Sequence, residues 1–166
     1  MSTTGSIIQI NVSRGGIPKL PIVEATVTPE GIRGDSWAHP RYHGGPKQAL
    51  LFICSESIDE LKAKGYRLFP GALGENLTTR GLDRRQMRSG QRYRIGDVLI
   101  ELTKVRVPCG TLDIYGPDIK HEIYDQQVKD GDPRSPRWAI SGFYAAVIRP
   151  GTLRQHDIIT LVDQAV

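Results

Sequence analysis

Cysteine is scarce in this sequence, and so are the patterns of a secreted or membrane protein. The 166 residues contain two cysteines, Cys54 and Cys109, which are too few for a disulfide scaffold. No apolar run approaches the roughly 20 residues that cross a bilayer, and no basic segment followed by an apolar stretch opens the sequence. We therefore expect a cytoplasmic protein that is not bound to a membrane and whose sulfur chemistry is that of free thiols.

Several catalytic signatures are missing as well. The sequence has no Gly-x-Ser-x-Gly turn, no Cys-x-x-Cys pair, no His-Glu-x-x-His pair and no dinucleotide-binding glycine pattern. Its net charge of +4 comes from basic residues that are interleaved with acidic ones. This pattern favours a small anionic ligand over nucleic acid, because a nucleic-acid backbone is usually bound by several basic residues on one face.

Glycine and proline are plentiful, with 18 and 11 residues, which favours short strands joined by many turns. The length fits one domain over residues 1–166. We predict a mainly β fold with a few helices. Its strands are expected where β-branched or apolar residues run between turn signals, at 6–12, 22–28, 48–54, 91–95, 98–105, 143–148 and 157–162.

Three local signals within this pattern are sharper than the rest. Ser57 followed by Glu60 matches a capping box, and Gly65 provides a C-terminal stop, so one helix is expected between them. Gly96 and Asp97 form a tight turn between two strands and predict a hairpin. The apolar run at 48–54 predicts a central strand that is buried on both faces.

Four glycine- or proline-rich stretches border the expected strands, at residues 31–47, 70–79, 106–110 and 135–147. Loops often carry function because the strands beside them hold them rigidly. We expect the four to converge at one rim of a barrel and to form the functional site. In the second loop, the amide of Asn76 offers hydrogen bonds either to a ligand or to a tight turn of its own loop.

The first loop contains two histidines and a pattern suited to an anion. His39 and His43 have the spacing of a helical zinc pair, but a proline between them argues against a helix. Hydrogen-bonded loop histidines are the simpler interpretation. Gly44 and Gly45 can present consecutive backbone N–H groups to an anion, and Lys47 adds a positive charge.

The third loop contains a cysteine in a setting that suits chemistry. A proline precedes Cys109 and a glycine follows it, while Lys104 and Arg106 place positive charge nearby to favour a thiolate. A thiolate can act as a nucleophile, a sulfur carrier or a soft metal ligand. Cys54, at the end of an apolar run, instead fits a buried structural cysteine.

Taken in order, these loops resemble the MOSC domain family, named for the C-terminal domain of molybdenum cofactor sulfurase. The resemblance covers about residues 20–163 and rests on the ordered motifs GDxxxxxxxHGGxxxA, PGxxGENLTTxGL, IGD, RxPC and GFYAAV. It implies a β-barrel-like domain with a few helices that holds molybdenum cofactor (molybdopterin) in a basic cleft. A cofactor with a phosphate, a polar pterin and a dithiolene-bound metal needs an anion site, amide-type hydrogen bonds and a soft ligand.

The resemblance also implies roles for individual residues. Cys109 corresponds to the family cysteine, which ligates molybdenum or carries persulfide sulfur, and His43 to a histidine that lines the catalytic pocket. Asp35 is expected to orient its loop. The positions that would bind the phosphate, the pterin edge and the anionic portions of the cofactor are Gly44, Gly45, Lys47, Asn76, Thr78, Arg106 and Arg137.

Three functions follow from the resemblance. The first is a molybdenum-dependent oxidoreductase component that reduces N-hydroxylated small molecules and takes its electrons from a separate donor protein. The second is a sulfur carrier, with a Cys109 persulfide received from a cysteine desulfurase and passed to a metal–sulfur cluster or cofactor. The third is a non-catalytic module for cofactor delivery. From the residues alone, a cysteine hydrolase that pairs Cys109 with His39 or His43 also stays open.

Overall fold

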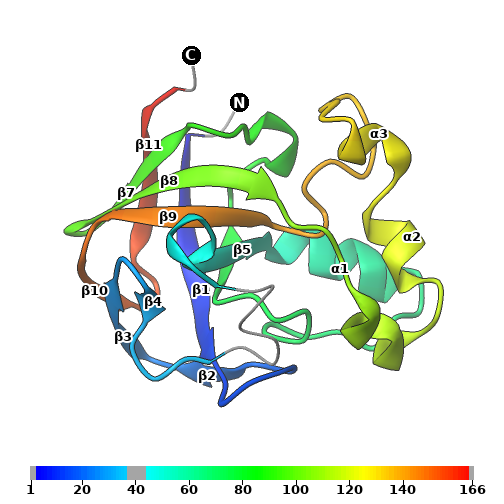
Figure 1. Ribbon diagram of the computed structural model, residues 1–166, viewed down its shortest axis with the longest axis horizontal. Coiled ribbons are helices and arrows are strands. Elements are labelled where there is room, and N and C mark those ends of the chain that lie inside the picture. Colours follow the sequence, from blue (N-terminus) through cyan, green and yellow to red (C-terminus); the bar gives the residue numbers. More distant parts are fainter. Residues whose placement is uncertain (1–2, 37–43, 165–166) are drawn as a thin grey trace.

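The computed structural model describes residues 3–36 and 44–164 (Figure 1). Its strands are β1 (Thr4–Val12), β2 (Leu20–Ile22), β3 (Glu24–Thr28), β4 (Gly31–Ile32), β5 (Leu50–Cys54), β6 (Leu77–Arg80), β7 (Arg92–Ile95), β8 (Val98–Val105), β9 (Phe143–Arg149), β10 (Gly151–Arg154) and β11 (Ile158–Asp163). Its helices are α1 (Ser55–Ala63), α2 (Ile119–Ile123) and α3 (Gln126–Lys129), with 3-10 turns η1 (Pro46–Gln48), η2 (Arg84–Gln86) and η3 (Gly110–Tyr115).

Seven strands close into a mixed barrel, which confirms the predicted mainly β fold with a few helices. The hydrogen-bonded order is β1-β6-β5-β9-β8-β7-β11, and β11 pairs back with β1. Neighbouring strands run antiparallel except β5 and β6, which are parallel because α1 crosses between them. Strand β2 extends the sheet beside β1, and β10, β3 and β4 form a separate small sheet.

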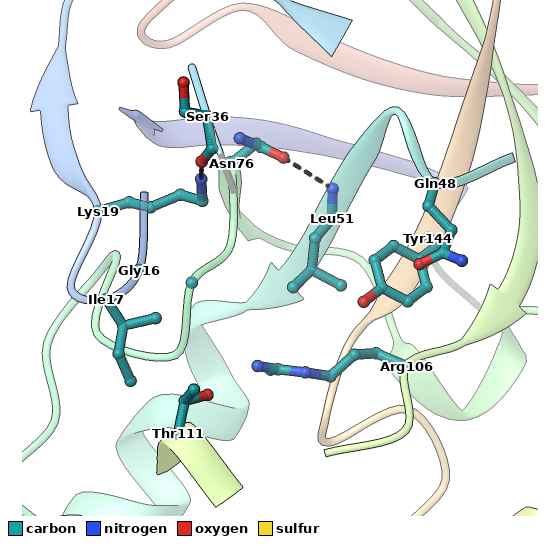
Figure 2. A pocket seen from close by; sticks show the side chains of 11 residues that line it. Gly16, Ile17, Lys19, Ser36, Gln48, Leu51, Asn76, Arg106, Thr111 and Tyr144 are labelled. Atoms are coloured by element: carbon teal, nitrogen blue, oxygen red, sulfur yellow. Dashed lines mark hydrogen bonds between the residues drawn. The ribbon is translucent and has the colours of Figure 1, made fainter. Parts of the chain in front are cut away.

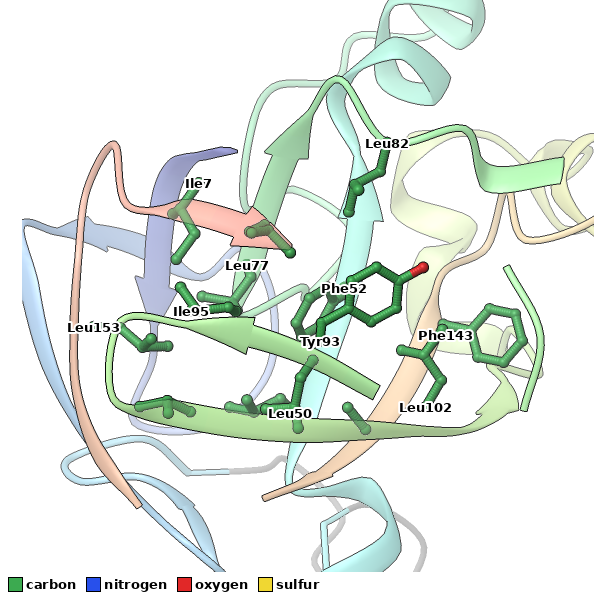
Figure 3. Packing of buried hydrophobic residues seen from close by; sticks show 14 of the residues in the cluster. Ile7, Leu50, Phe52, Leu77, Leu82, Tyr93, Ile95, Leu102, Phe143 and Leu153 are labelled. Carbon is green, nitrogen blue, oxygen red and sulfur yellow. The ribbon is translucent and has the colours of Figure 1, made fainter. Parts of the chain in front are cut away.

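The barrel interior holds the main hydrophobic core. On β8, the alternating residues Val98, Ile100 and Leu102 are buried, as expected for one inward face of a strand. Side chains from the surrounding strands meet them, as Figure 3 shows for Phe52 and Leu77. The expected hairpin is confirmed, because β7 and β8 pair from Ile95↔Val98 outward across the Gly96-Asp97 turn.

Strand β5 is buried on both faces, as the continuous apolar run predicts. Leu50 and Phe52 belong to the core inside the barrel, whereas Ile53 belongs to a second cluster that lies outside it. This second cluster also contains Leu61 of α1 and Ile119 of α2, so these helices cover part of the outer wall. The outer wall of the barrel beside this cluster is therefore partly covered, and a pocket can form there.

The predicted helix is present, but its start is corrected. The capping box is wrong, because α1 begins at Ser55 and its N-cap is Cys54, with no side-chain cap. Strand β5 runs directly into the helix without a loop, so Ser57 lies in the first turn, where its buried hydroxyl has no hydrogen-bond partner in the described part of the chain. The expected stop is confirmed, since Gly65 has φ +99° and its N–H bonds the carbonyl of Lys62.

No helix within residues 3–36 and 44–164 is long and apolar enough to cross a membrane.

Candidate functional site

A pocket lies against the outer face of β5 and β9, beside the second hydrophobic cluster. Leu51 and Tyr144 are register partners across these strands and point away from the barrel core (Figure 2). The pocket is open on one side and has a volume of about 60 Å³. The pocket is lined by Gly16, Ile17, Lys19, Ser36, Gln48, Leu51, Gly74, Asn76, Arg106, Thr111 and Tyr144.

The expected convergence of the four loops is confirmed, with one correction to its position. Ser36, Asn76, Arg106 and Tyr144 each come from a different one of the four stretches, and all line the pocket. They meet at the outer wall and not at the barrel rim, because the outward positions of β5 and β9 form the floor. Of the remaining lining residues, Leu51 belongs to β5 and Gly74 to the second loop, and the others come from the turn before β2 and from η1 and η3.

Arg106 is a fixed, buried cation facing this pocket. The residue is 6% exposed, and its guanidinium donates to the carbonyls of Leu73 at 2.8 Å and Ser141 at 3.3 Å. The Ser141 hydroxyl in turn donates to the Arg106 carbonyl at 2.6 Å. Burial lowers the pKa of Arg106, yet a guanidinium stays charged in proteins. No carboxylate pairs with it among the described residues, so its charge is available to an anion.

Glu75 is an acidic residue near Arg106. The burial of Glu75 makes it a weaker counter-ion for the Arg106 guanidinium. The side chain is fully buried, and burial raises the pKa of its carboxyl group, although hydrogen bonds from Gly71 and Thr78 oppose this shift. One oxygen, Oε2, accepts both hydrogen bonds, while Oε1 has no partner in the described residues. Burial therefore favours the neutral form of Glu75, and this carboxyl group makes no ion pair with Arg106 among the described residues.

A second buried cation in the pocket wall is already neutralised. The Nζ atom of Lys19 lies 2.7 Å from Oδ1 of Asp35 and also donates to the carbonyl of Ser36 at 3.1 Å. Asp35 further accepts the backbone N–H of Ser13 and the side-chain amide of Asn76. These bonds confirm that Asp35 orients its loop. Lys19 is a pocket residue that sequence reasoning missed, because its burial depends on a loop distant in the sequence.

The predicted polar residues of the second loop are committed to internal hydrogen bonds. The amide of Asn76 lines the pocket, but it accepts from the Leu51 N–H and donates to the Asn11 carbonyl and to Asp35. Thr78 is fully buried, does not line the pocket and bonds to Glu75. Asn76 can offer a ligand at most the second lone pair of its oxygen, and Thr78 serves the loop itself.

Cys109, at the N-cap of η3, does not line the pocket itself and reaches it only through its contact with the lining residue Thr111. The residue is half-buried, and its Sγ atom is 2.9 Å from Oγ1 of Thr111, which lines the pocket. Burial is the largest influence on the pKa values of Arg106 and Tyr144, and the charge of Cys109 is a further influence on both. The thiol therefore lies within the field of the pocket cation. The other cysteine, Cys54, is buried in the barrel core, as predicted.

The other predicted site residues do not line the pocket. Gly44 and Gly45 both have positive φ, and Gly45 caps η1, whose last residue, Gln48, does reach the pocket. Lys47 is exposed, and its carbonyl accepts from the Thr103 hydroxyl at 2.6 Å.

Arg137 and the histidines complete the predicted set. Arg137 lies 3.8 Å from Asp125, and its buried Nε has no partner in the described residues. His39 and His43 lie outside the described residues, so the catalytic role of His43 stays a prediction.

The comparisons with known proteins agree with the motifs. A family model described as the MOSC domain matches residues 39–160. The protein YiiM of Escherichia coli (strain K12) is 32% identical over 96 residues, which cover 55% of this chain and 43% of that protein. The uncharacterized protein YflK of Bacillus subtilis (strain 168) is 31% identical over 98 residues, covering 57% and 43%. The matched region thus spans less than half the length of these relatives.

Solved structures share the fold along nearly the whole chain. The structure of YiiM from Geobacillus stearothermophilus has a TM-score of 0.74 at 24% identity and covers 98% of this chain and 77% of that one. The YUAD protein of Bacillus subtilis has a TM-score of 0.73 at 16% identity and covers 99% of both chains. At these identities the likeness concerns the fold alone.

Proposed function

The chain belongs to the MOSC domain family, and from this premise we propose that it binds molybdenum cofactor with Cys109 as the protein ligand of the metal. We propose further that it is the cofactor-bearing component of a reductase acting on N-hydroxylated small molecules. The observation that carries the proposal is a pocket lined by a buried guanidinium, Arg106, that lacks a carboxylate partner in the described residues, with the half-buried thiol of Cys109 in contact with the lining residue Thr111.

The chemistry of these residues fits the two distinctive ends of the cofactor. A thiolate at Cys109 is a soft ligand of the kind that binds a sulfur-ligated metal, and the fixed guanidinium of Arg106 can bind an oxyanion. The pocket volume of about 60 Å³ admits only the end of a ligand, because sites for whole organic ligands span about 300 Å³ or more. The rest of a pterin would lie on the open side of the pocket.

Molybdenum would supply the two-electron chemistry of the reduction. The residues of this chain would hold and orient the reacting groups. Cys109 would bind through Sγ, with the Thr111 hydroxyl beside it able to donate a hydrogen bond to the thiolate. Arg106 would attract the negative charge, and its bonds to Leu73 and Ser141 would keep it in place. Preorganised charge of this kind favours a transition state in which negative charge develops.

The test compares the wild type with Cys109→Ser and with Cys54→Ala, a control at the cysteine in the core. Molybdenum content, pterin fluorescence and reduction of a hydroxylamino base by reduced methyl viologen are measured after expression in a cofactor-producing host. We expect Cys109→Ser to lose activity and metal ligation, while folded Cys54→Ala keeps both. Full activity in Cys109→Ser would overturn the proposal. Bound cofactor without reduction by any donor would leave a delivery module.

A sulfur carrier is the second candidate. The small volume of the pocket and the position of Thr111 beside the Cys109 thiol both favour it. A persulfide adds one sulfur atom to Cys109, which needs far less space than a pterin, and Thr111 and Arg106 could stabilise its negative charge. Mass spectrometry after incubation with a cysteine desulfurase and cysteine should then detect one added sulfur on Cys109. A protein that gains no sulfur under these conditions is not a carrier.

A further inference from the structure

The phenol of Tyr144 lines the pocket, and its direction is fixed by the packing of β9. Its neighbours Phe143 and Ala145 are buried in the barrel core, so the alternation of β9 directs Tyr144 to the outer wall. It pairs in register with Leu51 of β5 and Lys104 of β8. The Lys104 Nζ atom lies 5.9 Å from the ring centroid, which places a cation near the ring.

The hydroxyl of Tyr144 differs from those of Tyr93 and Tyr115, which are held by other groups of the protein. The hydroxyl of Tyr93 bonds to Gln91, and that of Tyr115 bonds to the Ala72 carbonyl. The Tyr144 hydroxyl has no hydrogen-bond partner among the described residues, and in Figure 2 it points into the space that the Arg106 guanidinium also faces. Tyr144 is half-buried and its oxygen is not among the buried polar atoms that lack a partner, so the hydroxyl is open to water or to a ligand that enters the pocket.

Tyr144 also remains a hydrogen-bond donor near neutral pH. Burial raises the pKa of its hydroxyl above the ordinary value of 10.0, although Arg106 opposes this shift. The protonated phenol and the guanidinium therefore form a pair of donors directed at one space, and Thr111 offers another hydroxyl at its edge. Such a pair suits an oxygen atom that gains negative charge.

We propose that the Tyr144 hydroxyl is the catalytic residue that donates a hydrogen bond to the oxygen of the substrate N–O bond. This inference rests on the proposed reductase function. In the reaction, R–NH–OH takes two electrons and two protons and gives R–NH2 and water, so the N–O bond breaks and new N–H and O–H bonds form. The electrons come from the external reductant and the protons from solvent. Tyr144 keeps its own proton and, with Arg106, stabilises the charge on the departing oxygen.

Binding provides a test that is independent of bound metal. The probes are N4-hydroxycytosine and cytosine, which differ by a single oxygen, and their dissociation constants are measured by calorimetry on the protein as purified. One hydrogen bond should give the wild type about a five- to tenfold preference for the hydroxylated base. Tyr144→Phe, which removes only the hydroxyl, should lose most of this preference and keep only what Arg106 and Thr111 contribute. Absence of a preference in the wild type, or an unchanged preference in Tyr144→Phe, would overturn the inference.

Turnover then separates this inference from the proposed function. With reduced methyl viologen as the electron source, Tyr144→Phe should keep its molybdenum content while its kcat falls about 100-fold, the order seen when one oxyanion donor is removed. Tyr115→Phe is the matched control, because its hydroxyl bonds to the backbone and it should keep kcat. The wild type could prefer the hydroxylated base yet contain no molybdenum and fail to reduce that base. This result would refute the proposed reductase function and leave Tyr144 as a binding residue.

Discussion

The ammonium group of Lys19 and the carboxylate of Asp35 form an ion pair of 2.7 Å in the wall of the pocket, with side chains only 6% and 2% exposed. The pair joins the turn before β2 to the loop after β4, and Asn76 ties both to the second loop through Asp35. Three segments distant in sequence are therefore held together by one buried carboxylate. This arrangement makes the shape of the pocket depend on a charge that sequence patterns do not reveal.

Asp35→Asn should destabilise the fold strongly. The substitution leaves the Lys19 ammonium buried without its counter-charge, and breaking such a pair costs about 3–5 kcal/mol of the free energy of unfolding. Urea unfolding measures the loss. Glu122→Gln is the control, because its partner Lys64 is 56% exposed and such surface pairs contribute about 0–1 kcal/mol. Equal, small losses in the two variants would contradict the buried role of Asp35.

Glu75→Gln should change how stability depends on pH. Burial raises the pKa of the Glu75 carboxyl group, so the folded protein holds this proton more tightly than the unfolded chain. The resulting stability is fully present below the unfolded pKa of about 4.3 and is lost as the pH rises through the folded pKa. A glutamine stays neutral and escapes this loss. In urea unfolding between pH 4 and 8, the variant should therefore gain stability relative to the wild type as the pH rises. A difference in free energy of unfolding that stays constant with pH would refute the prediction.

The two cysteines should react very differently with an alkylating agent. Burial raises the pKa of the Cys54 thiol to about 12, whereas Cys109 is half-buried beside the lining residue Thr111. Iodoacetamide at pH 8 should therefore label Cys109 in the native protein and leave Cys54 unmodified, because the thiolate is the nucleophile and needs access. Peptide mass spectrometry reads out each site. Labelling in urea, where both cysteines should react, is the control, and native labelling of Cys54 would contradict its burial.

The parts of the fold that were predicted correctly are those specified by neighbouring residues. The alternation in β8 and the Gly96-Asp97 turn lie within one short segment, and the hairpin could be predicted from that segment alone. Strand β10 was missed because its four residues, Gly151–Arg154, include only one apolar side chain and show no run of β-branched or apolar residues. The start of α1 was misplaced because β5 enters the helix directly, a connection that the capping pattern at Ser57 does not indicate.

The site divides in the same way. Arg106 and Cys109 lie three residues apart in one loop that contains proline and glycine, so their residue types alone predict a reactive thiol beside a positive charge. The sequence places Tyr144 only within the motif GFYAAV, because a tyrosine in an apolar strand does not indicate which face of the strand it occupies. Thr78 was assigned to the ligand because a sequence does not reveal that Glu75 already holds its hydroxyl.

Gly142 approaches β5 so closely that no side chain fits, and Gly142→Ala should destabilise the protein for two reasons. A Cβ atom there would lie 2.6 Å from the Phe52 carbonyl oxygen, and the residue has φ +105°. The left-handed conformation costs about 1–2 kcal/mol for a residue with a side chain, and overpacking adds about 1–3 kcal/mol. Because the Gly142 carbonyl also accepts the Arg106 N–H, cofactor content should fall with stability.

Gly131→Ala isolates the conformational part of this loss. Gly131 has φ +80°, but a Cβ atom there would meet nothing within 4 Å, so only the cost of about 1–2 kcal/mol for the left-handed conformation is expected. Urea unfolding of both variants gives the difference, which measures how rigidly β5 is held against the segment that carries Arg106. Equal losses would mean that β5 shifts to admit the methyl group. In that case β5, which forms part of the pocket floor, is held less rigidly than its close packing against Gly142 implies.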